Sequence, residues 1–236
     1  MDLKTKAIVL RRTNYGEADR ILQVLTPEGK FGVLARGVRK EKSKLAGGIE
    51  LFSVSEIVVH RGRGDLGILT SARLTVFYAE IMKNYDAMTM MGKMMKEVAK
   101  ISEQVDSVEF FNMLEQTMLG VNNVLKRDGG AREISEKLRV IRVWWEMNLA
   151  KYGGGEANLH LDAEAKKFCE QKNYKWDEGQ EALVEDCFGK VDARHIKMMR
   201  IINSCPLDTV LRVKGAEDLM DEISQVAKCV YKTQGC

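Results

Sequence analysis

The sequence predicts an α+β fold in which a small antiparallel β-barrel is followed by a helical domain. Five short runs of β-branched and aliphatic residues fill the first eighty positions, and glycine-containing turns join them. From residue 81 onward, apolar residues recur every three or four positions, which is the period of a helix. The domain boundary is therefore expected near residue 80, between a barrel over residues 1–80 and a helical domain over 81–236.

The five expected strands are short and carry no helical pattern between them. A hairpin turn separates the second from the third, because Pro27 fixes φ and Gly29 allows a positive φ. The expected strands cover residues 4–12, 20–26, 31–38, 49–61 and 66–77.

The remainder of the chain is expected to be all-α. A glycine run at 153–155 ends one helix, and Asp192 is a suitable N-cap for a later one. The stretch from 156 to 191 is polar and only weakly patterned, so no element is expected there. The apolar stripes that mark the helices cover residues 81–98, 110–125, 138–149, 195–202 and 219–230.

Composition limits the class of protein. The chain has 236 residues, of which 45% are hydrophobic and 30% charged, and this excludes a disordered tail or a collagen-like repeat. No apolar run approaches the roughly 20 residues that span a bilayer, and the N-terminus lacks a signal-peptide segment, so a cytoplasmic location is expected. The five cysteines form no Cys-x-x-Cys pair, so neither a disulfide framework nor a four-cysteine zinc site is predicted.

The charge is unevenly divided. The whole chain carries a formal charge of +3, but residues 1–80 hold 14 Lys and Arg against 9 Asp and Glu, a net of +5. The rest holds 23 against 25, a net of −2. An asymmetry of this kind suggests that the first domain meets a polyanion.

The densest basic segment lies between the third and fourth expected strands, and its glycines suggest a mobile loop. Long cations on a loop can follow a phosphodiester backbone without a fixed geometry; the alternative is a solvated hairpin tip. Arg61 and Arg63 flank glycines in the next turn and could border the same groove. Tyr15 and Phe31 are candidates for base stacking or for the core. The segment's candidate DNA-binding residues are Arg36, Arg39, Lys40, Lys42 and Lys44.

A second candidate site lies in the helical domain. Arg139 and Arg142 are one helical turn apart and stand beside Trp144 and Trp145. Two cations at an apolar pocket suit an acidic, hydrophobic peptide. The alternative, two exposed arginines on the polar face of a core helix, is slightly favoured.

Catalytic motifs are scarce. His60, His160 and His195 are the three histidines, and none has a His or Cys at metal-ligand spacing. No nucleophile elbow, P-loop or paired-carboxylate signature is present. The glycines from 62 to 67 match G-x-G-x-x-G, but a strand follows where the dinucleotide fingerprint requires a helix. The sequence therefore favours a binding protein over an enzyme.

Three blocks of sequence carry a resemblance to a known family. They are Gly16-Glu17-Ala18-Asp19-Arg20-Ile21, then Ala35-Arg36-Gly37-Val38-Arg39-Lys40 with Lys42-Ser43-Lys44-Leu45-Ala46-Gly47, and then Arg61-Gly62-Arg63-Gly64. In order and spacing they resemble the bacterial recombination mediator family RecO over about the first 80 residues. Leu138-Arg139 followed by Tyr152-Gly153 is similar to that family's helix before its zinc module.

The resemblance implies an N-terminal OB-fold and a DNA repair and recombination mediator that is not an enzyme. Such a protein binds single- and double-stranded DNA, anneals complementary strands and helps load recombinase onto DNA coated by single-strand-binding protein. The implied partners are RecR and the acidic C-terminal tail of single-strand-binding protein, recognised near Arg139. The implied location is bacterial and nucleoid-associated, with no membrane. An OB-fold RNA-binding module is the alternative.

The chain departs from the family pattern at one place. Many relatives carry two Cys-x-x-Cys pairs where this sequence has only Cys169 and Cys187. No cofactor is therefore expected, and the segment 156–191 is expected to be held by packing alone.

Overall fold

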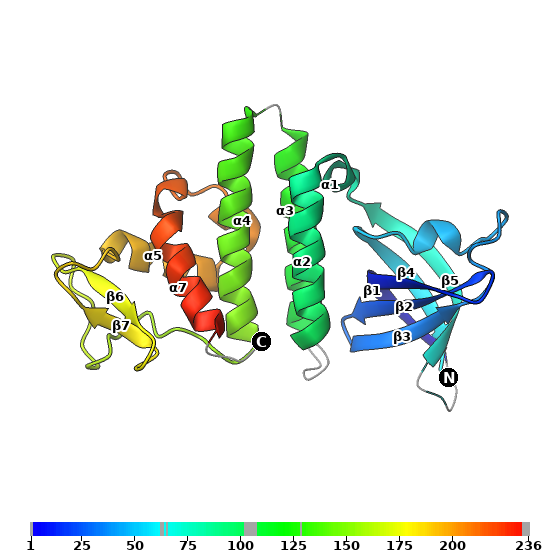
Figure 1. The fold of residues 1–236 in the computed structure, drawn as a ribbon, viewed down its shortest axis with the longest axis horizontal. Helices are drawn as coiled ribbons and strands as arrows, with labels where there is room; N and C mark the ends of the chain where they lie inside the picture. The colour runs from blue at the N-terminus through cyan, green and yellow to red at the C-terminus, as the bar shows by residue number, and fades with distance from the viewer. Residues whose placement is uncertain (1, 62–63, 65, 102–107, 128, 233–236) are drawn as a thin grey trace. The chain divides into compact units, whose positions relative to one another are not determined.

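The chain forms two compact units, Met1–Asn122 and Asn123–Cys236. The computed structural model describes every residue except 1, 62–63, 65, 102–107, 128 and 233–236 (Figure 1). In the part that it describes, no helix is long and apolar enough to cross a membrane. The five strands of the first sheet precede the long helices along the chain, in agreement with the α+β class.

Five strands of the N-terminal unit form a closed barrel in the order β1-β2-β3-β5-β4. Neighbouring strands are antiparallel except β3 and β5, which are parallel. A five-stranded closed barrel agrees with the architecture that the family resemblance implies. The strands are β1 (Asp2–Tyr15), β2 (Asp19–Thr26), β3 (Gly29–Ala35), β4 (Ser53–His60) and β5 (Leu66–Phe77).

Alternate residues of the strands fill the barrel, as the period of two requires. Val38 and Ile49, which lie in the connection between β3 and β4, are buried with the same cluster. Apolar residues of this connection therefore complete the core. The strand residues of the cluster are Ala7, Val9, Leu22, Val24, Val33, Ala35, Ile57, Val59 and Leu69.

Helices α1 (Ala79–Lys83) and α2 (Tyr85–Ile101) complete the N-terminal unit with most of α3 (Val108–Lys126). α2 packs against β1, and Lys30 of β3 donates to the carbonyl oxygen of Ala99 in α2. The Glu80 N–H donates to Asn122 Oδ1 at 3.1 Å. The predicted boundary near residue 80 thus marks the change from strand to helix, whereas the compact unit extends to Asn122 because these contacts join the first helices to the barrel.

Tyr78 stands at the junction between the barrel and these helices. It is buried, and its N–H donates to the Phe52 carbonyl oxygen at 3.0 Å. Burial raises the pKa of Tyr78 to about 12, and the charge of Glu115 adds to the effect. The phenol is therefore neutral at physiological pH and packs as part of the core.

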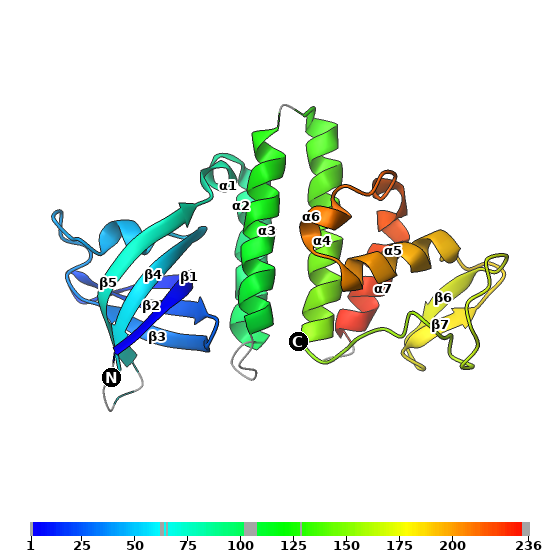
Figure 2. The ribbon, with the colours of Figure 1, turned by 180° about the vertical axis from the view of Figure 1, so that it is seen from behind.

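In the C-terminal unit, α4 packs against α5 and α7 (Figure 2). The expectation of an all-α domain is wrong, because two antiparallel strands form a hairpin in the segment that showed no clear pattern. Each strand has only four residues, too few for a visible period of two. The elements are α4 (Ala131–Tyr152), β6 (Tyr174–Asp177), β7 (Ala182–Glu185), α5 (Ala193–Ser204), α6 (Leu207–Val210), the 3-10 turn η2 (Glu217–Leu219) and α7 (Met220–Lys232).

The start of α5 confirms Asp192 as its N-cap. The Asp192 carboxylate accepts from the backbone N–H groups of Arg194 and His195, and the His195 ring lies against the Asp192 N–H in a capping box. Burial raises the pKa of Asp192, but the hydrogen bonds from Arg194 and His195 outweigh it and hold that pKa well below its usual range. His195 is buried between Asp192 and Glu222.

Replacing Gly48 by Ala should destabilise the barrel. Gly48 lies in the 3-10 turn η1 (Ala46–Gly48), where an added Cβ would come within 2.5 Å of the backbone of Ala72 in β5. We expect Gly48→Ala to lower the free energy of unfolding by about 1–3 kcal/mol in a urea titration. Gly47→Ala is the matched control, because its Cβ would meet no atom within 4 Å; equal stability of the two variants would contradict the packing.

Replacing Asp192 by Ala should cost about 1 kcal/mol at neutral pH through the lost cap. Because the folded-state pKa of Asp192 is lowered, the carboxylate stabilises the fold above the unfolded pKa of roughly 4 and loses this effect as the pH falls further. The difference between wild type and Asp192→Ala in urea titrations should therefore be full at about pH 6 and shrink below about pH 4. The control is Asp218→Ala, which removes an exposed acid of the same unit; a loss of stability at pH 6 equal to that of Asp192→Ala would contradict the role of the cap.

Candidate nucleic-acid interface

The basic loop leaves the barrel at the end of β3. The apolar residues of the loop face the barrel: Val38 is buried in the barrel core, and Leu45 packs against that core. The five predicted DNA-binding cations of the loop, Arg36, Arg39, Lys40, Lys42 and Lys44, are all exposed. The loop therefore covers the barrel core with its apolar side chains and turns its cations to solvent.

The loop is tied to the turn between β1 and β2. The Gly37 N–H donates to Asp19 Oδ1 at 2.7 Å, and the Arg39 N–H donates to the Ala18 carbonyl oxygen at 2.9 Å. Gly37 has a φ of +61°, a conformation that glycine adopts without strain. The loop predicted as mobile is thus built of turns that another part of the barrel holds in place.

Most cations of the loop have no partner among the described residues. The side chains of Arg36, Lys40, Lys42 and Lys44 form no hydrogen bond or ion pair with any residue that the structure describes. Arg39 differs, because its guanidinium donates to the Gly16 carbonyl oxygen at 3.3 Å. Unpaired cations gathered on one loop create a positive potential that attracts a polyanion.

Arg61 lies elsewhere on the barrel. Its guanidinium carbon is 4.2 Å from the centroid of the Phe31 ring, a cation–π distance. Phe31 lies near the start of β3, whereas Arg36 follows its end, so five residues of strand, roughly 17 Å, separate the two positions along the chain. The two basic segments thus flank β3 from opposite ends. Arg63 lies outside the described residues.

The two candidate stacking aromatics have different surroundings. Phe31 is partly buried against the barrel core and covered by Arg61. Tyr15 is 55% exposed and lies at the end of β1, in register with Asp19, the residue that holds the loop. Tyr15 is therefore the aromatic side chain available beside the basic loop.

Comparison with known proteins agrees with this geometry. Residues 1–78 match the family described as Recombination protein O N terminal. The DNA repair protein RecO of Dehalococcoides mccartyi (strain 195) is 27% identical over 230 residues, which cover 94% of this chain and 86% of the relative. That of Alkaliphilus metalliredigens is 23% identical over 237 residues, 97% of this chain and 92% of the relative. The chain is similar to RecO proteins over almost its whole length.

This similarity indicates a role in DNA repair and recombination. A further relative, the DNA repair protein RecO of Roseiflexus, is 34% identical over 126 residues, half of this chain. These names describe recombination and repair rather than an enzymatic activity, in agreement with the prediction of a non-enzymatic protein.

The two arginines that the sequence predicts as partner-binding residues, Arg139 and Arg142, are both paired. Arg139 lies 2.8 Å from Asp221 of α7, and Arg142 lies 2.9 Å from Glu146 one turn along α4. Trp144 and Trp145 are buried, and the Trp144 Nε1–H donates to the Cys205 carbonyl oxygen at 3.2 Å. The arginines thus lie at the surface of a core helix, and the tryptophan rings belong to its packing.

Residues 156–191, in which the family resemblance implies a zinc module, contain two cysteines with different surroundings. Cys187 is exposed, and Cys169 Sγ donates to Gln171 Oε1 at 2.9 Å. Among the described residues, no three His, Cys, Asp or Glu side chains are grouped to hold a metal ion.

Hydrogen bonds and one buried ring organise this segment instead. The Tyr174 ring is buried, and its hydroxyl accepts from the Cys169 N–H at 2.8 Å. Its backbone pairs in both directions with Val191. Asp162 accepts two backbone N–H groups, and Asp186 pairs with Lys175 at 2.6 Å. The expectation that packing alone holds residues 156–191 is therefore incomplete.

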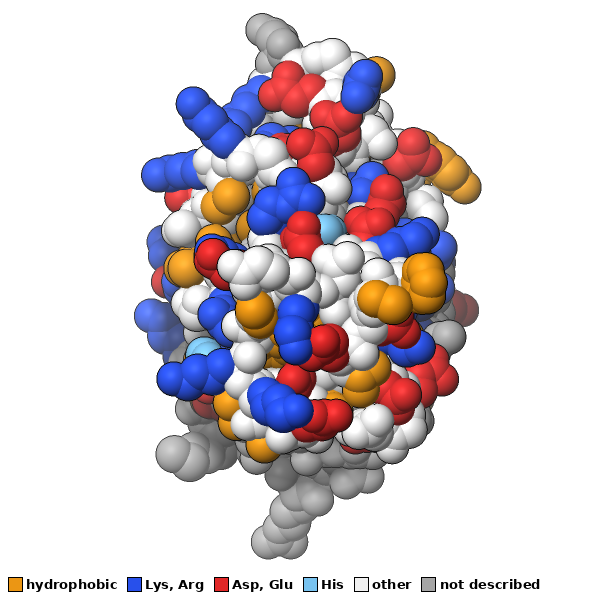
Figure 3. Space-filling view, turned by 90° about the vertical axis from the view of Figure 1, so that its left-hand side faces the viewer, with side chains coloured by type: hydrophobic (Ala, Val, Ile, Leu, Met, Phe, Trp, Pro, Cys, Tyr) orange, Lys and Arg blue, Asp and Glu red, His pale blue; other side chains and the backbone are white. Residues whose placement is uncertain are grey.

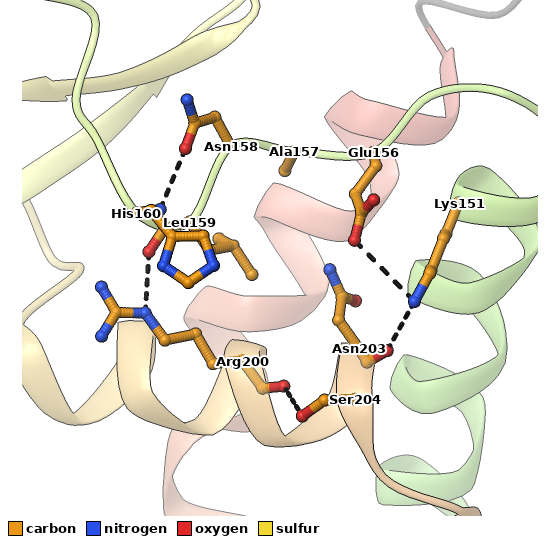
Figure 4. Close-up of a pocket in the computed structure, with 9 residues that line it drawn as sticks. All are labelled: Lys151, Glu156, Ala157, Asn158, Leu159, His160, Arg200, Asn203 and Ser204. Atoms are coloured by element: carbon orange, nitrogen blue, oxygen red, sulfur yellow. Dashed lines mark hydrogen bonds and ion pairs between the residues drawn. The ribbon is translucent and has the colours of Figure 1, made fainter. Parts of the chain in front are cut away.

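A pocket of about 460 Å³ in the C-terminal unit also contains cations, but they are engaged (Figure 4). Lys151 donates to the Asn203 carbonyl oxygen at 2.8 Å and lies 3.9 Å from Glu156. Arg200 donates to the Leu159 carbonyl oxygen at 2.8 Å. These bonds attach the segment after α4 to α5, so we assign the pocket a structural role.

The hairpin face of the C-terminal unit differs from the basic loop in its charge. Figure 3 shows this face, on which acidic and basic side chains are intermixed and hydrophobic ones are scattered. Many of the cations are paired, as Lys172 is with Glu185 and Lys197 with Glu170. Such a face gives a weaker field than the unpaired cations of the loop.

Removing the carboxylate that holds the loop should release Gly37. A hydrogen bond to a charged acceptor contributes about 1.5–3 kcal/mol, so Asp19→Ala should speed amide exchange at Gly37 roughly tenfold to hundredfold, measured by NMR. Glu17→Ala removes a neighbouring exposed acid of the same turn and should leave the rate unchanged. Unaltered exchange at Gly37 in Asp19→Ala would refute the tether.

Proposed function

We propose that this RecO-like protein binds single- and double-stranded DNA through the basic loop of an OB-fold domain and anneals complementary strands. The observation that carries the proposal is the set of unpaired, exposed cations at Arg36, Lys40, Lys42 and Lys44. Cations that have no internal partner lose no ion pair when they meet phosphate. Their binding releases the counterions condensed on DNA, which drives association without regard to sequence.

The proposed mechanism is non-covalent. Two strands repel each other through their phosphates, and cations placed between them reduce this repulsion so that base pairing can proceed. Tyr15, exposed beside the loop, would hold a base of a single strand by stacking. Arg39 would act mainly by fixing the loop, because its guanidinium already bonds the Gly16 carbonyl oxygen. Arg61 and Arg63 are proposed to extend the contact past the start of β3.

The remaining roles concern the partners of the family. We propose that the helical domain brings the protein to DNA coated by single-strand-binding protein, with that protein's acidic tail recognised near Arg139 and Arg142. To bind a tail carboxylate, Arg139 would exchange Asp221 for the new partner. RecR is the proposed partner in loading the recombinase onto the exposed strand.

Neutralising three loop lysines should weaken DNA binding and its dependence on salt. If the wild type contacts about 4–6 phosphates of a single strand, log K against log salt should have a slope near −3 to −4. The triple variant Lys40→Gln, Lys42→Gln, Lys44→Gln should make that slope shallower by about 2 and weaken binding roughly tenfold or more, measured by fluorescence anisotropy with an oligonucleotide. Annealing of complementary strands should slow in parallel.

The matched control removes the same charge from the other unit. Lys190, Lys214 and Lys228 are exposed, and the variant Lys190→Gln, Lys214→Gln, Lys228→Gln should retain the wild-type slope. Equal losses in the two triple variants would show that only net charge matters and would reject the loop as the interface. Tighter binding to structured RNA than to DNA in competition would favour the alternative of an RNA-binding module.

A further inference from the structure

The C-terminal unit presents a large apolar side chain to solvent. Phe188 lies in the segment between β7 and α5 and is 92% exposed, the highest value among the large hydrophobic side chains of the described residues. Aromatic side chains are common anchors of protein–protein interfaces. One exposed ring does not make a site by itself, so the turn that carries Phe188 and the pocket beside it decide what the ring can do.

The turn that carries Phe188 is held in place. The Phe188 N–H donates to Asp186 Oδ1 at 2.8 Å, and the Gly189 N–H donates to the Asp186 carbonyl oxygen at 2.9 Å. A Cβ on Gly189 would come within 2.3 Å of the Tyr174 carbonyl oxygen, so the glycine lets the turn pack closely against β6. The ring is therefore presented by a preorganised turn, which lowers the entropy cost of docking.

A pocket of about 430 Å³ opens beside this turn, between the hairpin and α7. Its apolar wall consists of Val191 and Val226, which are buried, and of Trp176, which is partly buried. Pockets that bind small ligands have volumes of about 300–1,000 Å³. The pocket is thus large enough to receive a phenyl ring.

One polar group of the pocket lacks a partner. The Trp176 Nε1 atom is buried and has no hydrogen-bond acceptor among the described residues. A buried N–H without an acceptor is unfavourable. An occupant of the pocket is therefore favoured if it brings an oxygen acceptor together with an apolar group, as the main chain around a phenylalanine does.

The charges that line the pocket are balanced. Its lining has two cations, Lys175 and Lys190, and two carboxylates, Asp186 and Glu222. Lys175 pairs with Asp186 at 2.6 Å, whereas Lys190 is exposed and has no partner among the described residues. Such a lining does not attract a polyanion or an acidic peptide, but it lets two identical surfaces meet without repulsion, since Lys190 of one copy can approach Glu222 of the other.

We propose that two copies of this chain associate through this surface, each placing its Phe188 ring in the pocket of the other. A two-fold interface requires a surface that is complementary to itself, and this one carries a projecting ring and a pocket side by side. The ring would lie against Val191 and Val226, and a main-chain carbonyl oxygen of the second copy would accept from Trp176 Nε1.

The association is expected to be weak. Two aromatic rings bury roughly 300–500 Å², whereas stable interfaces bury about 1,200–2,000 Å². Docking of the rings therefore suits a transient dimer that forms as the protein concentration rises. The proposal goes beyond the DNA-binding role, because it concerns a second copy of the chain and a surface of the C-terminal unit.

The first test is sedimentation equilibrium of the full chain over a concentration series that extends into the submillimolar range. The wild-type mass should rise from 26.7 kDa toward twice that value. Phe188→Ala should weaken the association about tenfold or more, because an anchor ring is lost. Gln225→Trp adds bulk at an exposed residue of the pocket lining and should also weaken it.

Tyr85→Ala is the matched control. Tyr85 is a 75% exposed aromatic residue of α2 and does not line the pocket, so this variant should associate as the wild type does. Thermal unfolding of each variant checks the fold. Because Phe188 is exposed, Phe188→Ala should unfold at the wild-type temperature.

The second test maps the contact. A benzophenone amino acid in place of Phe188 should give, under ultraviolet light, a crosslinked dimer in which the label is attached to peptides that contain Trp176 or Val226. The proposal is overturned if the wild type stays monomeric throughout the series, or if Phe188→Ala associates as the wild type does. It is also overturned if the crosslinks lie outside the pocket or form only within one molecule.

The outcome is separable from the DNA-binding proposal. Phe188→Ala should keep wild-type affinity for an oligonucleotide at concentrations at which both proteins are monomeric. The variant neutralised at Lys40, Lys42 and Lys44 should associate as the wild type does. A parallel loss of DNA binding in Phe188→Ala would contradict two separate surfaces.

Discussion

The barrel closes through three residue pairs between the parallel strands β3 and β5, and the position of the basic loop follows from this closure. A Cβ on Gly32 would come within 2.5 Å of the Leu66 side chain, and one on Gly67 within 2.4 Å of the Val59 side chain. Gly32 therefore lets β3 approach β5, and Gly67 of β5 leaves room for the Val59 side chain of β4. Because β4 pairs with β1 and β5 and not with β3, the connection from β3 must pass over one end of the barrel to reach it. Val38 and Ile49 fill that end, and the cations between them point to solvent.

Much of this fold could be predicted from the sequence, because alternation and helical periodicity are local signals. The hairpin β6–β7 could not, since its stability comes from contacts such as those of Tyr174 with Cys169 and Val191 rather than from a repeating pattern. The tether of the loop was also invisible, because Asp19 and Gly37 are 18 positions apart and neither is unusual for a turn. Their presence in two separate blocks of the family resemblance was the one available hint that they belong together.

The candidate site also combines features that could be predicted from the sequence with features that could not. Exposure of the loop cations followed from composition, since five bases and one acid cannot be buried together. The contact of Arg61 with Phe31 and the pairing of Arg139 with Asp221 depend on tertiary structure. Sequence alone therefore could not tell unpaired cations from engaged ones. That distinction separates the loop, where four of the five predicted cations have no partner among the described residues, from α4, where a ligand must first displace an internal partner.

The burial of Trp144 and Trp145 has a practical consequence. The chain has three tryptophans, and all of them, including Trp176 in β6, lie in the C-terminal unit. Tryptophan fluorescence therefore follows the unfolding of the C-terminal unit and does not follow the unfolding of the barrel. Unfolding of the barrel must be followed by tyrosine absorbance or far-ultraviolet circular dichroism. If its midpoint differs from that of the tryptophan fluorescence, the two units unfold in separate steps.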